Sequence, residues 1–146
     1  MVRLEESIVV ERPIEDVFAY LTDPATLSEW QPTVVDARFE SAGPVRVGSR
    51  VIETRKFLGK RIHATMVVVE NEPPRRFAIE AASGPIPVRV TSTLAEVDGA
   101  TRIDTVLEGD PGGLFRLGAP FVVRAAEREL RKNLAALKRI LENHAR

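Results

Sequence analysis

The spacing of apolar residues predicts two short helices near the start of the chain. Apolar residues occupy the i, i+3, i+4 and i+7 positions of residues 14–21, which is typical of a helix that buries one face. Pro13 suits the first helical position, because the N–H that proline lacks has no partner there. Asp23-Pro24 repeats this start signal, and Gln31-Pro32 ends the second helix, since a residue before proline avoids helical geometry. A strand over residues 3–10 precedes both helices.

An alternating pattern over residues 33–41 predicts the next strand. Its inward positions are Val35, Ala37 and Phe39. Glycine and proline at Gly43-Pro44 and Gly48 then interrupt the chain, so we expect a loop before the following strand.

A hairpin turn at Gly59-Lys60 assigns the faces of the two strands around it. Counting back from this turn pairs Glu53 with Met66 and Arg55 with Ala64, and paired residues share one face. That face is the more apolar one and is therefore taken as inward, although a slip of one residue would reverse the assignment. Glu53 and Arg55 are then charged residues on the inner face of a sheet.

The Asp98-Gly99 dipeptide is the strongest hairpin signal in the chain. Counting from it pairs Ser92 with Thr105 on the inward face. Turns at Pro73-Pro74 and Gly84-Pro85 separate the remaining strands. Six strands joined by short turns predict an antiparallel meander.

Beyond residue 113 the apolar period changes to that of one long helix. Its stripe is formed by Val122, Ala126, Leu130, Leu134, Leu137 and Leu141. We expect a helix of about 25 residues that lies across the sheet, and Pro120 marks either its start or a kink.

These elements predict a single α+β domain over residues 1–146, in which a sheet grips a helix around a cavity. A chain of 146 residues, of which 44% are hydrophobic, buries enough surface to fold as one unit. It contains no cysteine, and no apolar run approaches the ~20 residues that span a bilayer. We therefore expect a cytoplasmic location without stable membrane insertion.

The charges balance overall but are unevenly distributed. Residues 116–146 carry eight Lys/Arg and three Glu, so this segment is +5 and the rest of the chain is −5. A basic terminal helix is typical of a solvated outer face, and the alternative is contact with an acidic partner or an anionic membrane. Its cations lack the interleaved aromatic residues of a nucleic-acid site, so we expect no nucleic-acid partner.

The sequence predicts no catalytic motif, metal site or cofactor. His63 falls on the outward face of its strand and His144 lies near the end of the chain, so neither is expected to act as a base. Inward Glu53 and Arg55 are the exception, because buried charges require partners. They either pair for structural reasons or orient the polar end of a ligand. As a third alternative, an acid beside Arg55 would assist enolisation or dehydration.

Aromatic and small polar residues complete the predicted cavity. Trp30 ends the second short helix, where it would cap the cavity or fill the core. Phe115 and Phe121 flank the start of the long helix and would form an opposite lip, while Met66 supplies an adaptable wall. The candidate ligand-binding set is Trp30, Phe39, Glu53, Arg55, Phe57, Met66, Ser92, Thr105, Phe115 and Phe121.

Four segments carry a family resemblance. Residues 12–18 (Arg-Pro-Ile-Glu-Asp-Val-Phe), the Thr-Asp-Pro at 22–24 with Trp30, the Glu-Pro-Pro-Arg-Arg-Phe at 72–77 and residues 133–142 are similar to the bacterial polyketide cyclase/dehydrase-like branch of the START-related SRPBCC superfamily. The resemblance implies a Bet v 1-like helix-grip fold: about seven curved antiparallel strands, two small helices and a C-terminal helix over a cavity. It also implies an apolar ligand such as a lipid, sterol or polyketide. No universal catalytic motif accompanies it.

We therefore expect this chain to bind a small, mostly hydrophobic ligand for carriage or sensing. The alternative is a cyclase or dehydratase that uses Glu53 and Arg55. A further alternative is an interaction module built on the basic terminal helix, and a homodimer is a possible assembly.

Overall fold

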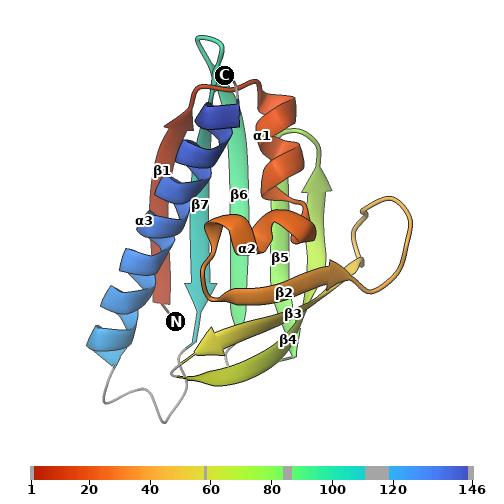
Figure 1. Ribbon diagram of the computed structural model, residues 1–146, viewed down its shortest axis with the longest axis vertical. Coiled ribbons are helices and arrows are strands. Elements are labelled where there is room, and N and C mark those ends of the chain that lie inside the picture. Colours follow the sequence, from red (N-terminus) through yellow and green to blue (C-terminus); the bar gives the residue numbers. More distant parts are fainter. Residues whose placement is uncertain (1, 58, 84–86, 111–118, 145–146) are drawn as a thin grey trace.

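Seven antiparallel strands form one curved sheet in the computed structural model, which describes residues 2–57, 59–83, 87–110 and 119–144 (Figure 1). The strands are β1 (Val2–Val10), β2 (Val34–Phe39), β3 (Arg50–Phe57), β4 (Lys60–Glu72), β5 (Arg76–Ser83), β6 (Val88–Val97) and β7 (Ala100–Gly109). Their order across the sheet is β1-β7-β6-β5-β4-β3-β2, so the predicted meander of six strands is confirmed and β1 closes its far edge.

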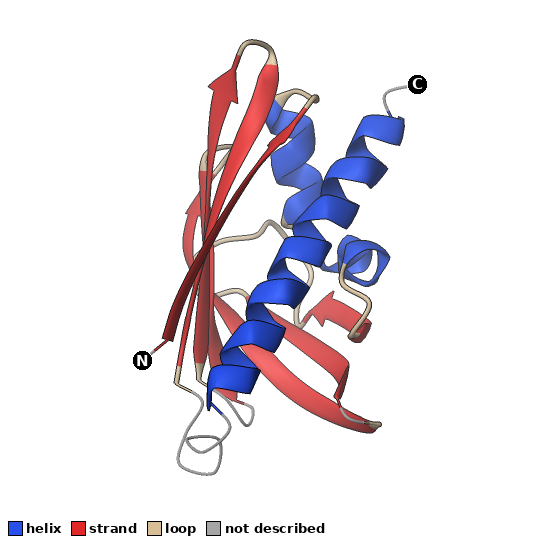
Figure 2. Cartoon of the chain, turned by 90° about the vertical axis from the view of Figure 1, so that its left-hand side faces the viewer, coloured by secondary structure: helices blue, strands red, loops and turns tan. Residues whose placement is uncertain are grey.

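The helices lie on one face of this sheet. They are α1 (Ile14–Leu21), the 3₁₀ turn η1 (Pro24–Thr26), α2 (Leu27–Trp30) and α3 (Ala119–His144). Figure 2 shows α3 running diagonally over the inner face of the sheet, beside the two short helices. This arrangement is the helix-grip fold that the resemblance implies.

The two short helices begin within one residue of their start signals, and Pro13 is the extended N-cap before α1 instead of its first helical residue. The Asp23 side chain accepts a hydrogen bond from the Ala25 N–H at 2.9 Å, so it caps η1 as predicted. The Tyr20 hydroxyl donates to Glu29 Oε1 at 2.7 Å and ties α1 to α2. Burial of Tyr20 raises the pKa of this hydroxyl most, and the hydrogen bond to Glu29 raises it further. The phenol therefore stays protonated and keeps the two helices in register.

The hairpin at Asp98-Gly99 has the predicted register. Asp98 and Gly99 have φ angles of 49° and 81°, the left-handed values that a two-residue turn of this kind requires. Ser92 pairs with Thr105, and both side chains are buried on the inner face. Local turn chemistry therefore places this polar pair.

The β3–β4 hairpin has a register two residues away from the predicted one. Glu53 pairs with Ala64 and Arg55 pairs with Ile62, so the predicted partners were wrong. Gly59, with a φ of 77°, sits directly before the first residue of β4, whereas the prediction made it the first residue of the turn. Because side chains alternate with a period of two, this shift leaves Glu53 on the inward face.

Strand β2 departs from the predicted alternation at its start. A register shift separates Val34 from Asp36 in the ladder with β3, which is the signature of a β-bulge. As a result Val34 is 4% exposed and Val35 is 41% exposed, so the predicted inward position of Val35 was wrong. Ala37 stays half-buried, as its inward position requires.

The leucine stripe of α3 packs into the core. Its members Leu130, Leu134, Leu137 and Leu141 are buried and belong to the same cluster as Val17, Phe77 and Leu94. The side chain of Val122, the first predicted member, lies outside the described residues. The predicted orientation of α3 is therefore confirmed over its last three turns.

Hydrogen bonds join the C-terminal end of α3 to the β1–α1 junction, and the contacts of Arg12, Lys138 and Glu142 described next are here named the latch. Arg12 Nη1 donates to the carbonyl of Leu141 at 2.7 Å, and the Glu11 N–H donates to Glu142 Oε2 at 2.9 Å. Lys138 Nζ donates to the carbonyl of Val9 at 2.6 Å and to Glu142 at 2.8 Å. Lys138 of the basic helix is therefore bound to β1 and to Glu142. No helix of the described segments is long and apolar enough to cross a membrane.

Candidate functional site

A cavity of about 220 Å³ lies between the inner face of the sheet and the helices. Its apolar wall includes Leu21, Met66, Ile79, Val88, Val90, Leu107, Ala126, Leu130 and Leu134. Its polar wall is formed by Trp30, Gln31, Glu53, Arg55, Ser92, Thr105, Glu129 and Asn133. The cavity is therefore mostly apolar, with polar groups at selected points.

Strand and helix periodicities bring the polar groups together. Glu53 and Arg55 are two residues apart on β3 and so share its inner face, while β6 and β7 contribute the Ser92–Thr105 pair. Glu129 and Asn133 are four residues apart on α3, one helical turn, and border the cavity from the opposite side.

Arg55 organises the polar wall through three hydrogen bonds. Its Nε donates to Glu53 Oε1 at 2.9 Å, its Nη1 to Thr33 Oγ1 at 3.1 Å, and its Nη2 to Gln31 Oε1 at 2.9 Å. The Glu53 side chain is 5% exposed and the Arg55 side chain 33% exposed. The ion pair therefore runs from the buried interior toward the surface, where its cation is partly solvated.

This network continues to the terminal helix. The Thr33 hydroxyl donates to Glu129 Oε1 at 3.0 Å while its oxygen accepts from Arg55. The chain of contacts joins β3, the segment after α2, and α3. It therefore fixes the edge of the cavity at which these three elements meet.

Two buried polar atoms of the cavity wall differ from this network. Within the described part of the chain, Trp30 Nε1 and Thr105 Oγ1 are the buried side-chain nitrogen or oxygen atoms that have no hydrogen-bond partner. Trp30 is 6% exposed and Thr105 is 4% exposed, and both line the cavity. Buried polar groups in native proteins are nearly always paired, so these two need an explanation.

The structure brings six of the ten candidate residues to the cavity. They are Trp30, Glu53, Arg55, Met66, Ser92 and Thr105. Phe115, and the side chain of Phe57, lie outside the described residues. These positions remain predictions as ligand contacts.

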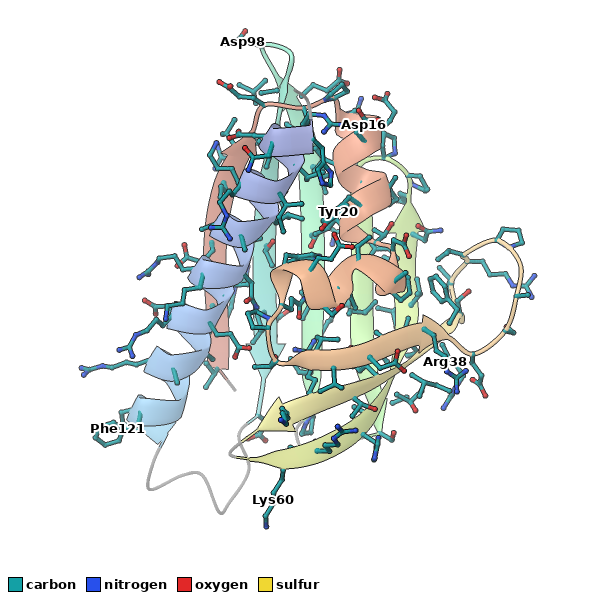
Figure 3. The ribbon with its side chains drawn as sticks, viewed as in Figure 1. Asp16, Tyr20, Arg38, Lys60, Asp98 and Phe121 are labelled. Atoms are coloured by element: carbon teal, nitrogen blue, oxygen red, sulfur yellow. The ribbon has the colours of Figure 1, made fainter. Side chains whose placement is uncertain are left out.

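Phe39 and Phe121 are corrections to the predicted site. Phe39 lies at the far end of β2 and borders a separate pocket of about 60 Å³ with the loop that follows. Phe121 is 78% exposed and points away from the sheet at the lower end of α3 (Figure 3). Helical spacing explains the second error, because Phe121 is three residues from exposed Arg124 and lies on the same outer face.

Gln31, Glu129 and Asn133 are cavity residues that the sequence analysis missed. Asn133 and Glu129 adjoin Leu134 and Leu130 on the helix, so they lie at the border of its apolar stripe. A polar residue next to the apolar stripe of a helix was therefore the sequence signal that could have identified Glu129 and Asn133 as cavity residues.

Among the described residues there is no group of three His, Cys, Asp or Glu side chains that could hold a metal ion.

Comparison with known families identifies the family of this chain. The family described as "Polyketide cyclase / dehydrase and lipid transport" matches residues 1–142. The chain belongs to this family. No sequence among curated proteins matches it significantly.

Solved structures share the fold of this family member at low sequence identity. A protein from Thermus thermophilus superposes with a TM-score of 0.84 at 14% identity, covering 99% of this chain and 100% of that chain. A START superfamily protein from Mycobacterium smegmatis gives 0.79 at 12% identity, covering 97% of both chains. The di-domain ARO/CYC protein BexL of the BE-7585A biosynthetic pathway gives 0.72 at 21% identity, covering 95% of this chain and 46% of BexL. These likenesses establish the helix-grip fold.

Proposed function

We propose that this protein binds a small, mostly hydrophobic ligand in the cavity between the sheet and α3. The observation that carries the proposal is the cavity itself, because its wall is mainly apolar and carries a few fixed polar groups. The family description, which names both polyketide chemistry and lipid transport, supports a ligand of this class.

The volume of the cavity limits the size of the ligand. A buried apolar cavity of about 150 Å³ accommodates benzene, whereas drug-sized ligands occupy about 300–1,000 Å³. At about 220 Å³ this cavity suits a molecule with one or two rings. A long-chain lipid would fit only if α3 moved away from the sheet.

Native mass spectrometry tests this proposal. The protein is mixed with one- and two-ring aromatic compounds and with long-chain fatty acids, and the expected result is retention of one small aromatic molecule per chain. Retention of none of these compounds would contradict the proposal.

A pair of variants on adjacent residues of α3 provides the control. Ala126 lines the cavity, while Ala125 is exposed on the outer face of the helix. Ala126→Phe should fill the cavity and abolish retention, and Ala125→Phe should leave retention unchanged. Equal retention by both variants would place the bound molecule elsewhere.

The polar network favours binding over the cyclase or dehydratase alternative. Arg55 already donates to Glu53, Thr33 and Gln31, so its guanidinium is held by the protein. An acid–base role would have to use Oε2 of Glu53, because Arg55 holds Oε1. Glu53→Gln should therefore retain the bound aromatic molecule, and loss of product formation in this variant would instead support the enzymatic alternative.

A second candidate function is docking on an anionic membrane surface. Arg124, Arg128, Lys132 and Arg139 form one outer stripe of α3, here named the basic stripe. All four side chains are exposed, and within the described residues none takes part in an ion pair. Exposed Phe121 precedes this stripe on the same face and would add one apolar contact to a lipid surface.

Vesicle binding tests the second candidate. Each cation near an anionic surface contributes about 1 kcal/mol, so changing Arg124, Arg128 and Lys132 together to Gln should weaken binding about 100-fold. The matched control changes to Gln three arginines in exposed ion pairs: Arg3 and Arg102 on the sheet, and Arg75 in the β4–β5 turn. Equal binding to phosphatidylcholine vesicles with and without phosphatidylserine would contradict this function.

A further inference from the structure

We infer that the cavity selects an uncharged ligand bearing a hydroxyl or carbonyl oxygen, in preference to a carboxylate. This inference rests on the proposed ligand-binding function and narrows its chemistry. It follows from two independent observations, the unpartnered polar atoms of the wall and the balance of charge around the cavity.

A ligand oxygen would supply the hydrogen-bond partner that these two atoms lack. Trp30 Nε1 is a donor only, so its partner must be an acceptor, whereas the Thr105 hydroxyl can donate or accept. Trp30 ends α2 and Thr105 lies on β7, so the two residues line different sides of one cavity. A ligand oxygen that reaches either atom removes the cost of leaving it unpaired. A plain hydrocarbon cannot do so.

The charges around the cavity disfavour an anion. Arg55 is the cation among the described residues that line it, while Glu53 and Glu129 supply two carboxylates. Arg55 Nε is bound to Glu53, and its other two hydrogen bonds go to Gln31 and Thr33. A ligand carboxylate would therefore lose its hydration without gaining an unpaired cation and would lie near like charge.

Three ligands with the same ring system test the selection. Naphthalene, 2-naphthol and 2-naphthoate differ only in the substituent, and their dissociation constants are measured by calorimetry near neutral pH. We expect 2-naphthol to bind about tenfold more tightly than naphthalene and more tightly than 2-naphthoate. Binding of 2-naphthoate as tight as that of 2-naphthol, or equal binding of naphthalene and 2-naphthol, would overturn the inference.

Failure of the proposed function has a different signature. It would appear as binding of none of the three ligands, or as binding that Ala126→Phe leaves unchanged, and either result removes the inference with it. Binding of all three that Ala126→Phe abolishes, without preference for 2-naphthol, would keep the proposed function and overturn only the inference.

Variants that remove one polar atom at a time assign the preference to residues. Trp30→Phe and Thr105→Val delete the N–H and the hydroxyl while keeping apolar bulk. At least one should reduce the 2-naphthol preference over naphthalene to about twofold, with a smaller change in naphthalene binding than in 2-naphthol binding. Thr105→Val should also keep or raise the melting temperature of the ligand-free protein, because it removes an unpaired buried hydroxyl. A merely structural role would lower the melting temperature and weaken both ligands equally, which would overturn the inference.

Discussion

Arg55 Nε donates to Glu53 Oε1 at 2.9 Å, although only one residue of β3 separates these two residues. Both side chains point inward from the same strand, and the carboxylate is the more deeply buried partner. The pair therefore places a neutralised polar group at the edge of a mostly apolar cavity.

Removing the cation of this pair should destabilise the protein. Arg55→Met leaves the buried Glu53 carboxylate without its partner, and we expect a loss of about 2–4 kcal/mol in the free energy of unfolding. Arg50 provides a matched control on β3, because its ion pair with Glu40 is exposed at about half of each side chain. Arg50→Met should cost less than about 1 kcal/mol. Equal losses in urea unfolding would show that the Glu53–Arg55 pair is not a buried one.

The outer and inner faces of α3 should respond differently to truncation. Leu137 is fully buried, so Leu137→Ala should cost about 2–5 kcal/mol. Arg139, two residues on, is exposed in the basic stripe, and Arg139→Ala should change stability by less than about 0.5 kcal/mol. Thermal unfolding measures both, and similar melting temperatures would mean that the helix faces the other way.

The latch at the end of α3 should make stability depend on pH. The hydrogen bond from the Lys138 ammonium holds the pKa of Glu142 below its ordinary value of 4.5, and the hydrogen bond from the Glu11 N–H lowers this pKa further. Because the folded state lowers this pKa, the contribution of Glu142 is complete above 4.5 and is lost as pH falls through the lower folded-state pKa. Glu142→Gln should therefore melt below the unmodified protein at neutral pH, and the difference should shrink in acid.

Glu5→Gln is the control for the latch. Glu5 forms an exposed ion pair with Arg3 on β1, so its loss should change stability by less than about 0.5 kcal/mol near neutral pH. A melting-temperature difference for Glu142→Gln that stays constant between about pH 3 and pH 7 would show that the latch does not depend on the Glu142 charge.

Local sequence signals predicted backbone geometry and strand register most accurately. The Asp98-Gly99 turn determines its own backbone geometry, so the register that pairs Ser92 with Thr105 was predictable. The bulge that turns Val35 outward has no comparable local signal, because it arises in pairing with a strand that starts fifteen residues later. Regular patterns within one element are therefore predictable, and irregular pairing between elements is not.

The candidate site was predictable in part for the same reason. Strand alternation placed Glu53 and Arg55 on the inner face even with the register shifted by two. The missing partner of Trp30 Nε1 could not be anticipated, because it depends on how α2, the sheet and α3 meet. The wrong prediction that Phe121 lines the cavity was avoidable, since its helical spacing from Arg124 already placed it on the outer face. The homodimer, given above as one possible assembly, stays a prediction.

Titration followed by Trp30 fluorescence tests the central claim most directly. Trp30 is the single tryptophan of the chain and lines the cavity, so its emission reports on ligand entry. With 1-indanone, an uncharged two-ring ketone, we predict saturable quenching with one site per chain, retained in Ala125→Phe and absent in Ala126→Phe. Quenching that rises linearly without saturation, and equally in both variants, would reflect random collisions and would contradict a ligand-binding cavity.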